Sequence, residues 1–215
     1  MSVTSFTIET PDEGAANAPP VVLASASESR RRLLRSAGVP FHAEASAVDE
    51  DEIKAALRAE GASAMQVAET LAELKARRIA HRHPGALIIG ADQMLDCEGR
   101  WLDKPGTRAA AAEQLRALSG RAHALLTSVC LLRDEQRIWH HNARAWLVMR
   151  PLSESFIEAY LDAVGEPALH GVGAYQIEGR GAQLFTQIEG DGFAIQGLPL
   201  LPLLEMLRQH GVLAR

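Results

Sequence analysis

The stretch from Val21 to Gly38 constrains the fold more than any other part of the chain. The apolar run 21–23 is typical of a short buried strand, and the small residues 24–27 follow it as a turn. Residues 29–37 are then predicted to form a helix, which Gly38 ends. A hydroxyl-rich turn that leads into a helix exposes backbone N–H groups and the positive end of the helix dipole. This strand–turn–helix unit therefore predicts an anion-binding seat.

Two serines and two arginines at this seat are candidates for binding phosphate: Ser25, Ser27, Arg30 and Arg31. Guanidinium groups match phosphate oxygens geometrically, which favours a phosphorylated ligand. The alternative is an ordinary solvated helix start, because most runs of charge are solvated. Arg32 and Arg35 lie elsewhere on the helix turn and are expected to face solvent.

Acidic residues gather where the chain returns from this helix. Residues 49–52 read Asp-Glu-Asp-Glu, shortly after the apolar Phe41. A basic turn followed by an acidic return predicts a polyphosphate held on one side of a site and a metal ion on the other.

A second candidate carboxylate follows an apolar run further along the chain. Residues 86–91 predict a central strand with Asp92 at its carboxyl end, where ligands gather in open α/β sheets. Glu50 and Asp92 together could bind a hard divalent cation such as Mg²⁺ through oxygen. Lys75 and Lys104 are candidates for neutralising a polyphosphate. The bland alternatives are a capping or loop carboxylate for Asp92 and a surface position for each lysine.

Charge and cysteine content limit the classes of partner and compartment. The 215 residues carry 22 Lys and Arg against 27 Asp and Glu, a net charge of −5, so the chain has no global attraction for a nucleic acid polymer. Its two cysteines form no metal-ligand pattern, and no signal peptide or membrane-spanning run is evident. We therefore expect a cytoplasmic protein with no membrane partner and a small phosphorylated ligand. The oligomeric state stays open, a homodimer included.

The order of the patterns predicts an α/β fold. Residues 1–20 are expected to form a flexible N-terminal extension, and residues 21–215 one domain. Further helices are expected near 63–81, 109–118, 154–164 and 201–210, and further strands near 121–132, 137–149 and 183–189. This alternation predicts a mixed, strongly twisted sheet with helices around it.

Eight motifs follow one another along the chain: LASASESRRRLL at 23–34, VDE at 48–50, LAELKA at 71–76, IGADQ at 89–93, LDKP at 102–105, LSGRAH at 118–123, GAYQIEGRGA at 173–182 and GLPL at 197–200. In this order they resemble the motifs of the Maf (septum-formation-inhibitor-like) nucleoside triphosphate pyrophosphatases. The resemblance covers essentially everything after the N-terminal extension. It implies hydrolysis of nucleoside triphosphates to the monophosphate and pyrophosphate with a divalent cation, Mg²⁺ or Mn²⁺. It also implies an elongated mixed sheet with two lobes around a nucleotide cleft.

The resemblance also implies roles for particular residues. Asp92 matches the family's proton acceptor, and several polar residues match its cleft motifs: Ser25, Arg30, Glu50, Lys75 and Lys104. Arg30, Gln93 and Glu178 are the expected specificity positions. Glu178 stands where other branches of the family carry Gln, and its alternative role is an ion pair with Arg180.

Some residues depart from the family pattern. Glu28 replaces the signature proline and Ser29 its first arginine, so that Arg30 alone matches the arginine pair and Arg31 is a candidate substitute. Gln93 and Glu178 favour the branch associated with 7-methyl-GTP over the branch that cleaves dTTP and UTP. The competing interpretation of the whole chain is a non-catalytic nucleotide-binding regulator of cell division, which would need the basic residues but no water-activating carboxylate.

Overall fold

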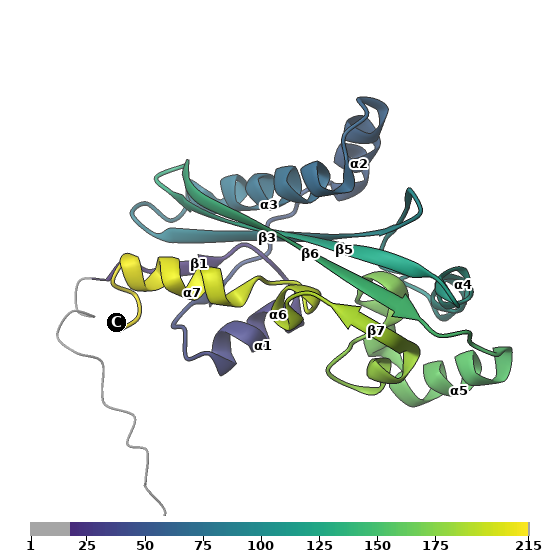
Figure 1. Ribbon diagram of the computed structural model, residues 1–215. Coiled ribbons are helices and arrows are strands. Elements are labelled where there is room, and N and C mark those ends of the chain that lie inside the picture. The colour runs from purple at the N-terminus through teal and green to yellow at the C-terminus, as the bar shows by residue number, and fades with distance from the viewer. Residues whose placement is uncertain (1–17, 215) are drawn as a thin grey trace, which may run out of the picture.

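The computed structural model describes residues 18–214, in which one mixed sheet carries seven strands. The central strands follow the order β2-β1-β3-β5-β6-β7, and β4 pairs with β3 beside this path (Figure 1). The strands are β1 Val21–Leu23, β2 His42–Ala43, β3 Leu87–Cys97, β4 Arg100–Leu102, β5 Ala122–Arg133, β6 Gln136–Met149 and β7 Phe185–Glu189. Strand β1 pairs in parallel with β2 and β3, and the other pairings are antiparallel. The predicted α/β class and mixed sheet are confirmed.

Helices cover both faces of this twisted sheet (Figure 1). They are α1 Glu28–Ser36, α2 Glu50–Ala59, α3 Ala64–Ala80, α4 Arg108–Leu118, α5 Glu154–Val164, α6 Gly192–Ile195 and α7 Leu200–Gln209. Helix α3 packs on one face through buried residues that contact β1, β3 and β5. On the other face, α1 and α7 share one core with β1, whereas α4 and α5 share another with the far ends of β5 and β6. We call the parts of the protein built around these two cores its two lobes.

Side-chain caps set the starts of several helices. Ser27, Ser63, Thr107 and Ser153 each accept a hydrogen bond from a backbone N–H in the first turn of the helix that follows. Ser63 also forms a reciprocal capping box with Gln66. The predicted helices after these residues are confirmed, because their capping signals are local.

Helix α2 is absent from the elements expected above. Asp49 caps it by accepting from the backbone N–H of Glu52 at 3.1 Å, and acidic residues fill its first turn. The helix dipole stabilises negative charge at a helix N-terminus. The acidic residues 49–52 therefore also favour the start of a helix. Helix α6 is also absent from the expected elements; Asp191 caps it by accepting from the backbone N–H groups of Phe193 and Ala194.

Asp92 lies within a strand and not at its end, so that part of the prediction was wrong. Strand β3 continues to Cys97, and Asp92 pairs with Ser128 of the antiparallel strand β5. A carboxylate in the middle of a buried strand is costly unless a cation accompanies it. The fold provides that cation from α3, which a local pattern does not reveal.

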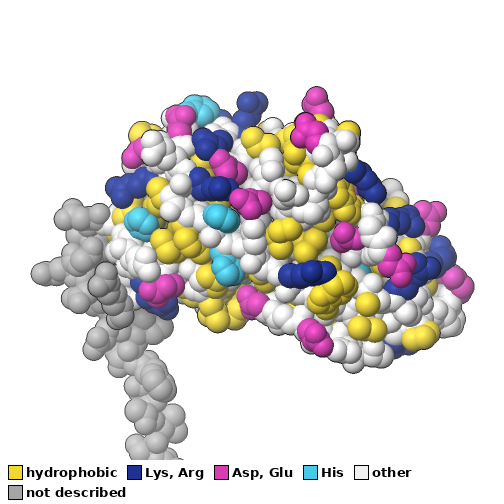
Figure 2. All heavy atoms as spheres, turned by 45° about the horizontal axis from the view of Figure 1, so that its top comes forward, with side chains coloured by type: hydrophobic (Ala, Val, Ile, Leu, Met, Phe, Trp, Pro, Cys, Tyr) yellow, Lys and Arg dark blue, Asp and Glu magenta, His cyan; other side chains and the backbone are white. Residues whose placement is uncertain are grey.

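The structure bears on the expected N-terminal extension and on membrane-spanning segments only within the residues that it describes. Of the predicted N-terminal extension, residues 1–17 lie outside the described residues, so its flexibility stays a prediction. Within residues 18–214, no helix is long and apolar enough to cross a membrane. On the face seen in Figure 2, basic and acidic side chains are interspersed, in keeping with the net charge of −5.

Gly90 sets the distance between α3 and β3. A Cβ atom at this position would lie 2.1 Å from the carbonyl oxygen of Ala72 and 2.9 Å from Cβ of Ala76. Glycine therefore lets the helix backbone approach the strand closely. Residues two apart on a strand share a face, so Gly90 and Asp92 both point toward α3.

We expect Gly90→Ala to destabilise the protein by about 3 kcal/mol or more, because the clash involves backbone and cannot be relieved by a rotamer change. Urea unfolding measures this loss. Gly192→Ala is the matched control, since a Cβ there meets nothing within 4 Å. Equal stability of the two variants would show that α3 has room to shift.

Candidate functional site

A cleft of about 790 Å³ lies between the two lobes. It is lined by the β1–α1 turn, the segment before α2, single residues of α3 and β3, and the segments 167–178 and 195–197. The predicted site residues that line it are Ser25, Ser27, Arg30, Glu50, Lys75, Gln93, Lys104 and Glu178. The structure therefore gathers residues from distant parts of the sequence into one cleft.

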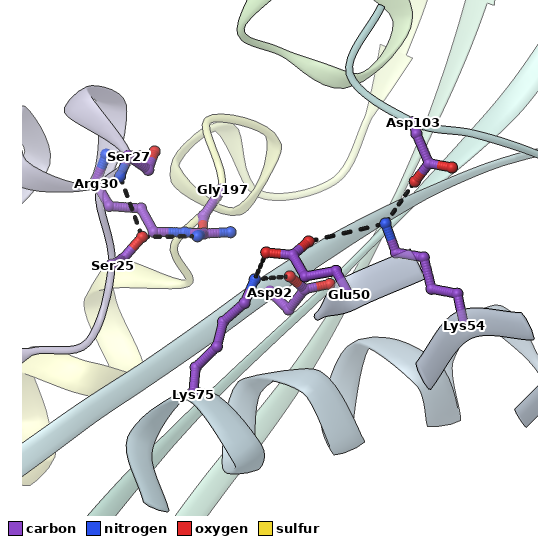
Figure 3. A network of polar contacts seen from close by, with 9 residues as sticks. All are labelled: Ser25, Ser27, Arg30, Glu50, Lys54, Lys75, Asp92, Asp103 and Gly197. Atoms are coloured by element: carbon purple, nitrogen blue, oxygen red, sulfur yellow. Dashed lines mark hydrogen bonds and ion pairs between the residues drawn. The ribbon is translucent and has the colours of Figure 1, made fainter. Parts of the chain in front are cut away.

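The predicted phosphate seat is preorganised around the start of α1. Ser25 Oγ accepts from the backbone N–H of Ser27 at 3.2 Å and from Nη1 of Arg30 at 3.1 Å. Nε of Arg30 donates to the carbonyl oxygen of Gly197 at 2.8 Å (Figure 3). Arg30 is buried, so these two bonds hold its guanidinium group in place while its other N–H groups stay available to an anion.

Arg31 and Arg32 occupy positions that differ from the expected ones. Arg31 is not among the residues that line the cleft, and its nearest carboxylate partner is Glu28 at 3.8 Å. Arg32, expected to face solvent, lines the cleft and forms an ion pair with Glu178. The alternative pairing of Glu178 with Arg180 is therefore replaced by a pairing with Arg32, which the fold brings close from 146 residues away.

On the opposite side of the phosphate seat, one ammonium group bridges two carboxylates. Nζ of Lys75 lies 2.5 Å from Oδ1 of Asp92 and 2.7 Å from Oε1 of Glu50 (Figure 3). Lys75 comes from α3, Asp92 from β3, and Glu50 is the first residue of α2. Asp92 is 4% exposed and lies beneath Lys75 instead of lining the cleft.

The surroundings of these carboxylates move their pKa values in opposite directions. Burial raises the pKa of Asp92 above its ordinary value, although Lys75 and Arg30 act against the rise. Burial also acts to raise the pKa of Glu50, but Lys75, Lys54 and Lys104 together lower it. Glu50 therefore stays ionised more readily than Asp92.

Lys54 extends this network in a way that the sequence patterns did not reveal. Its Nζ lies 2.5 Å from Oδ1 of Asp103 and 3.8 Å from Oε2 of Glu50. Asp103 precedes Lys104, so the pair ties α2 to the loop that carries Lys104 (Figure 3). Burial and the neighbouring Arg30 lower the pKa of Lys104. The i, i+4 spacing of Glu50 and Lys54 would have indicated this contact had α2 been predicted.

The two carboxylates fit a metal ion only in part on their own. Within residues 18–214, no group of three or more His, Cys, Asp or Glu side chains could hold a metal. However, Oδ2 of Asp92 is buried without a hydrogen-bond partner in the described chain. Mg²⁺ commonly binds one or two carboxylates and completes its shell with water and substrate phosphates. Glu50 and Asp92 therefore fit a divalent cation whose remaining ligands come from water and a polyphosphate.

Gln93 lies on β3 next to Asp92, and the protein fixes its side chain. Its Nε2 donates to Thr127 Oγ1 at 2.8 Å and to the carbonyl oxygens of Ala194 and Ile195 at 2.9 and 3.1 Å. The amide nitrogen is thus committed to the protein, and the amide oxygen is the group left for a ligand.

The open mixed sheet and the cleft lined by basic and acidic side chains define an α/β protein with a charged cleft between its lobes. The comparison with known families is more specific: the family model described as Maf-like protein matches residues 20–210. The chain therefore belongs to the Maf-like family, which confirms the resemblance found in its motifs.

Curated relatives match over nearly their whole length. A nucleoside triphosphate pyrophosphatase of Rhodospirillum rubrum is 58% identical over 195 residues, covering 91% of this chain and 96% of the relative. A protein of the same name from Paramagnetospirillum magneticum is 52% identical, covering 89% of this chain and 99% of the relative. A 7-methyl-GTP pyrophosphatase of Rhizobium meliloti is 49% identical, covering 91% and 98%.

Removal of the ammonium group of Lys75 tests how strongly its ion pairs contribute to the stability of the protein. We expect Lys75→Met to lower the free energy of unfolding by about 3–5 kcal/mol near neutral pH, because it leaves a buried carboxylate unpaired. Urea unfolding measures the loss. Lys54→Met is the comparison, with a loss of about 1 kcal/mol or less, because its partner Asp103 is 53% exposed.

The same variants test the fit to a metal. Added Mg²⁺ should raise the melting temperature of Lys75→Met more than that of the unmodified protein, since a cation can replace the lost ammonium between Glu50 and Asp92. An identical response of both proteins would count against these two residues as ligands.

Proposed function

We propose that the chain hydrolyses nucleoside triphosphates between the α- and β-phosphates, releasing a nucleoside monophosphate and pyrophosphate. The observation that carries this proposal is the buried Asp92, which has one oxygen held by Lys75 and the other without a partner, beside a seat for phosphate. A protein that only binds nucleotides needs the cations but not such a carboxylate. The names of the Maf-like relatives support the same reaction.

The polyphosphate is proposed to lie between the N-terminus of α1 and Lys104. Arg30 offers its free N–H groups, and the dipole of α1 favours negative charge at Ser27. Lys75 pairs with Glu50 and Asp92 in the free protein, and we expect its ammonium group to move to a phosphate oxygen when the polyphosphate enters. Charge on the departing pyrophosphate is stabilised by these same cations.

Asp92 is the proposed proton acceptor. A water oxygen forms a bond to the α-phosphorus, and the bond from that phosphorus to the oxygen bridging to the β-phosphate breaks. The water's proton passes to the carboxylate, and pyrophosphate leaves with the bridging oxygen. Because Asp92 lies beneath Lys75, we expect Lys75 to turn toward the entering phosphates and open the carboxylate to water.

Glu50 and Asp92 are the residues that would hold a divalent cation, Mg²⁺ or Mn²⁺. When bound, such an ion supplies positive charge that offsets the charge of the phosphates. Glu50 suits this role because its lowered pKa keeps it ionised.

Base preference, compartment and assembly belong to the same proposal. We propose that 7-methyl-GTP is among the substrates, with Gln93 and Glu178 contacting the base, as the name of the Rhizobium meliloti relative suggests.

A cytoplasmic location agrees with the two buried free thiols, Cys97 and Cys130. A homodimer stays a prediction, which light scattering would test.

Asp92→Asn should lower kcat by at least about 10²-fold, the usual scale for the loss of a general base. The change preserves side-chain volume, so we expect the variant to fold. Pyrophosphate release from a nucleotide panel with Mg²⁺ and Mn²⁺ measures the rate, and nucleotide binding checks that the cleft is intact. A folded variant with normal kcat would remove Asp92 from this role. Binding without turnover by the unmodified protein would favour the non-catalytic regulator.

Arg30→Ala should raise KM for every triphosphate by a similar factor, because phosphate contacts carry no information about the base. The kinetic panel checks this, and a loss confined to one base would move Arg30 to the specificity pocket. The same panel on Arg31→Ala tests the prediction for Arg31. An equal loss there would assign Arg31 to the phosphates despite its position outside the cleft lining.

A further inference from the structure

The ion pair between Arg32 and Glu178 joins the two walls of the cleft. Arg32 belongs to α1, whose core is shared with β1 and α7, whereas Glu178 follows Ile177, which packs against the core of α4 and α5. Both side chains line the cleft and stay partly exposed, at 47% for Arg32 and 25% for Glu178. The pair is therefore accessible to a ligand that lies in the cleft.

The segment that carries Glu178 suits a base. Arg30, Lys75 and Lys104 also line the cleft, and the proposed function assigns them to the polyphosphate. The segment that carries Glu178 instead lines the cleft with apolar and aromatic side chains: Pro167, Val172, Tyr175 and Ile177. Apolar walls with a few polar groups are typical of small-molecule sites, so we place the base against this segment and call it the base end of the cleft.

We propose that Arg32 is a specificity-determining residue that neutralises Glu178 and so sets the charge of the base end of the cleft. This inference rests on the proposed function. A free Glu178 carboxylate would favour a cationic base such as 7-methylguanine over neutral guanine by Coulomb attraction. With Arg32 paired to it, the site carries no net charge there, so both bases are accepted through hydrogen bonds to the remaining carboxylate lone pairs.

Charge balance predicts the sign of three changes in the ratio of kcat/KM for 7-methyl-GTP to that for GTP. Arg32→Gln leaves a net negative charge and should raise the ratio, by roughly fivefold for one charge at a half-exposed site. Glu178→Gln leaves a net positive charge and should lower it by a similar factor. The double variant is neutral again and should return near the original ratio.

These shifts distinguish charge from structure. A merely structural role would make both single variants change the ratio in the same direction or leave it unchanged, and either outcome would overturn the proposal. Electrostatic shifts should also shrink when ionic strength is raised from 0.05 to about 0.5 M, because salt screens exposed charges. Arg116→Gln is the matched control: Arg116 is 43% exposed and pairs with Glu154 away from the cleft, so its loss should leave the ratio unchanged.

A second readout separates this inference from the proposed hydrolysis. Calorimetry with 7-methyl-GMP and GMP gives the ratio of their Kd values without any turnover. The same order of variants in binding supports the role of Arg32 even if the protein released no pyrophosphate. Normal hydrolysis with an unchanged binding ratio in all variants would instead overturn the role of Arg32 and leave the proposed function intact.

Discussion

The buried ammonium of Lys75, placed between Glu50 and Asp92, is the interaction on which the site depends. Burying Lys75 and Asp92 is costly, and the cost is offset only while they stay paired at short distance with each other and with the partly exposed Glu50. These residues lie on α2, α3 and β3, so all three elements must be in place before the charges can pair. The site is therefore a property of the complete fold and not of any one segment (Figure 3).

Close packing makes this balance of charges possible. Small residues on α3, Ala72 and Ala76, face Gly90 on β3, and this contact brings the helix near enough for Lys75 to reach Asp92. Beyond it, charges alternate in sign from Asp92 through Lys75, Glu50 and Lys54 to Asp103. These three acidic and two basic side chains leave one negative charge in excess when all are ionised. An entering polyphosphate adds more negative charge, which would favour redistribution of the ammonium groups and recruitment of a cation.

The charged groups at the two ends of the cleft differ in burial and in how firmly the protein holds them. At the proposed phosphate end, Arg30 is buried and held by Ser25 and Gly197, so little entropy would be lost when an anion binds. At the other end, Arg32 and Glu178 are partly exposed and joined mainly to each other. This difference would give rigid recognition of the phosphates, which all substrates share. It would leave recognition of the base, which varies between substrates, adjustable.

The sequence by itself determined what depends on neighbours along the chain. Capping by Ser27, Ser63, Thr107 and Ser153 involves residues within a turn. Of the site residues that the sequence predicts, all but Arg31 and Asp92 line the cleft. Only the tertiary structure decided that Asp92 lies inside β3 beneath Lys75, that Arg31 stays outside the cleft lining, and that Arg32 pairs with Glu178. Local hydrogen bonds act over a few residues, whereas the choice of ion-pair partner depends on which charges the packed helices and sheet bring within a few ångströms.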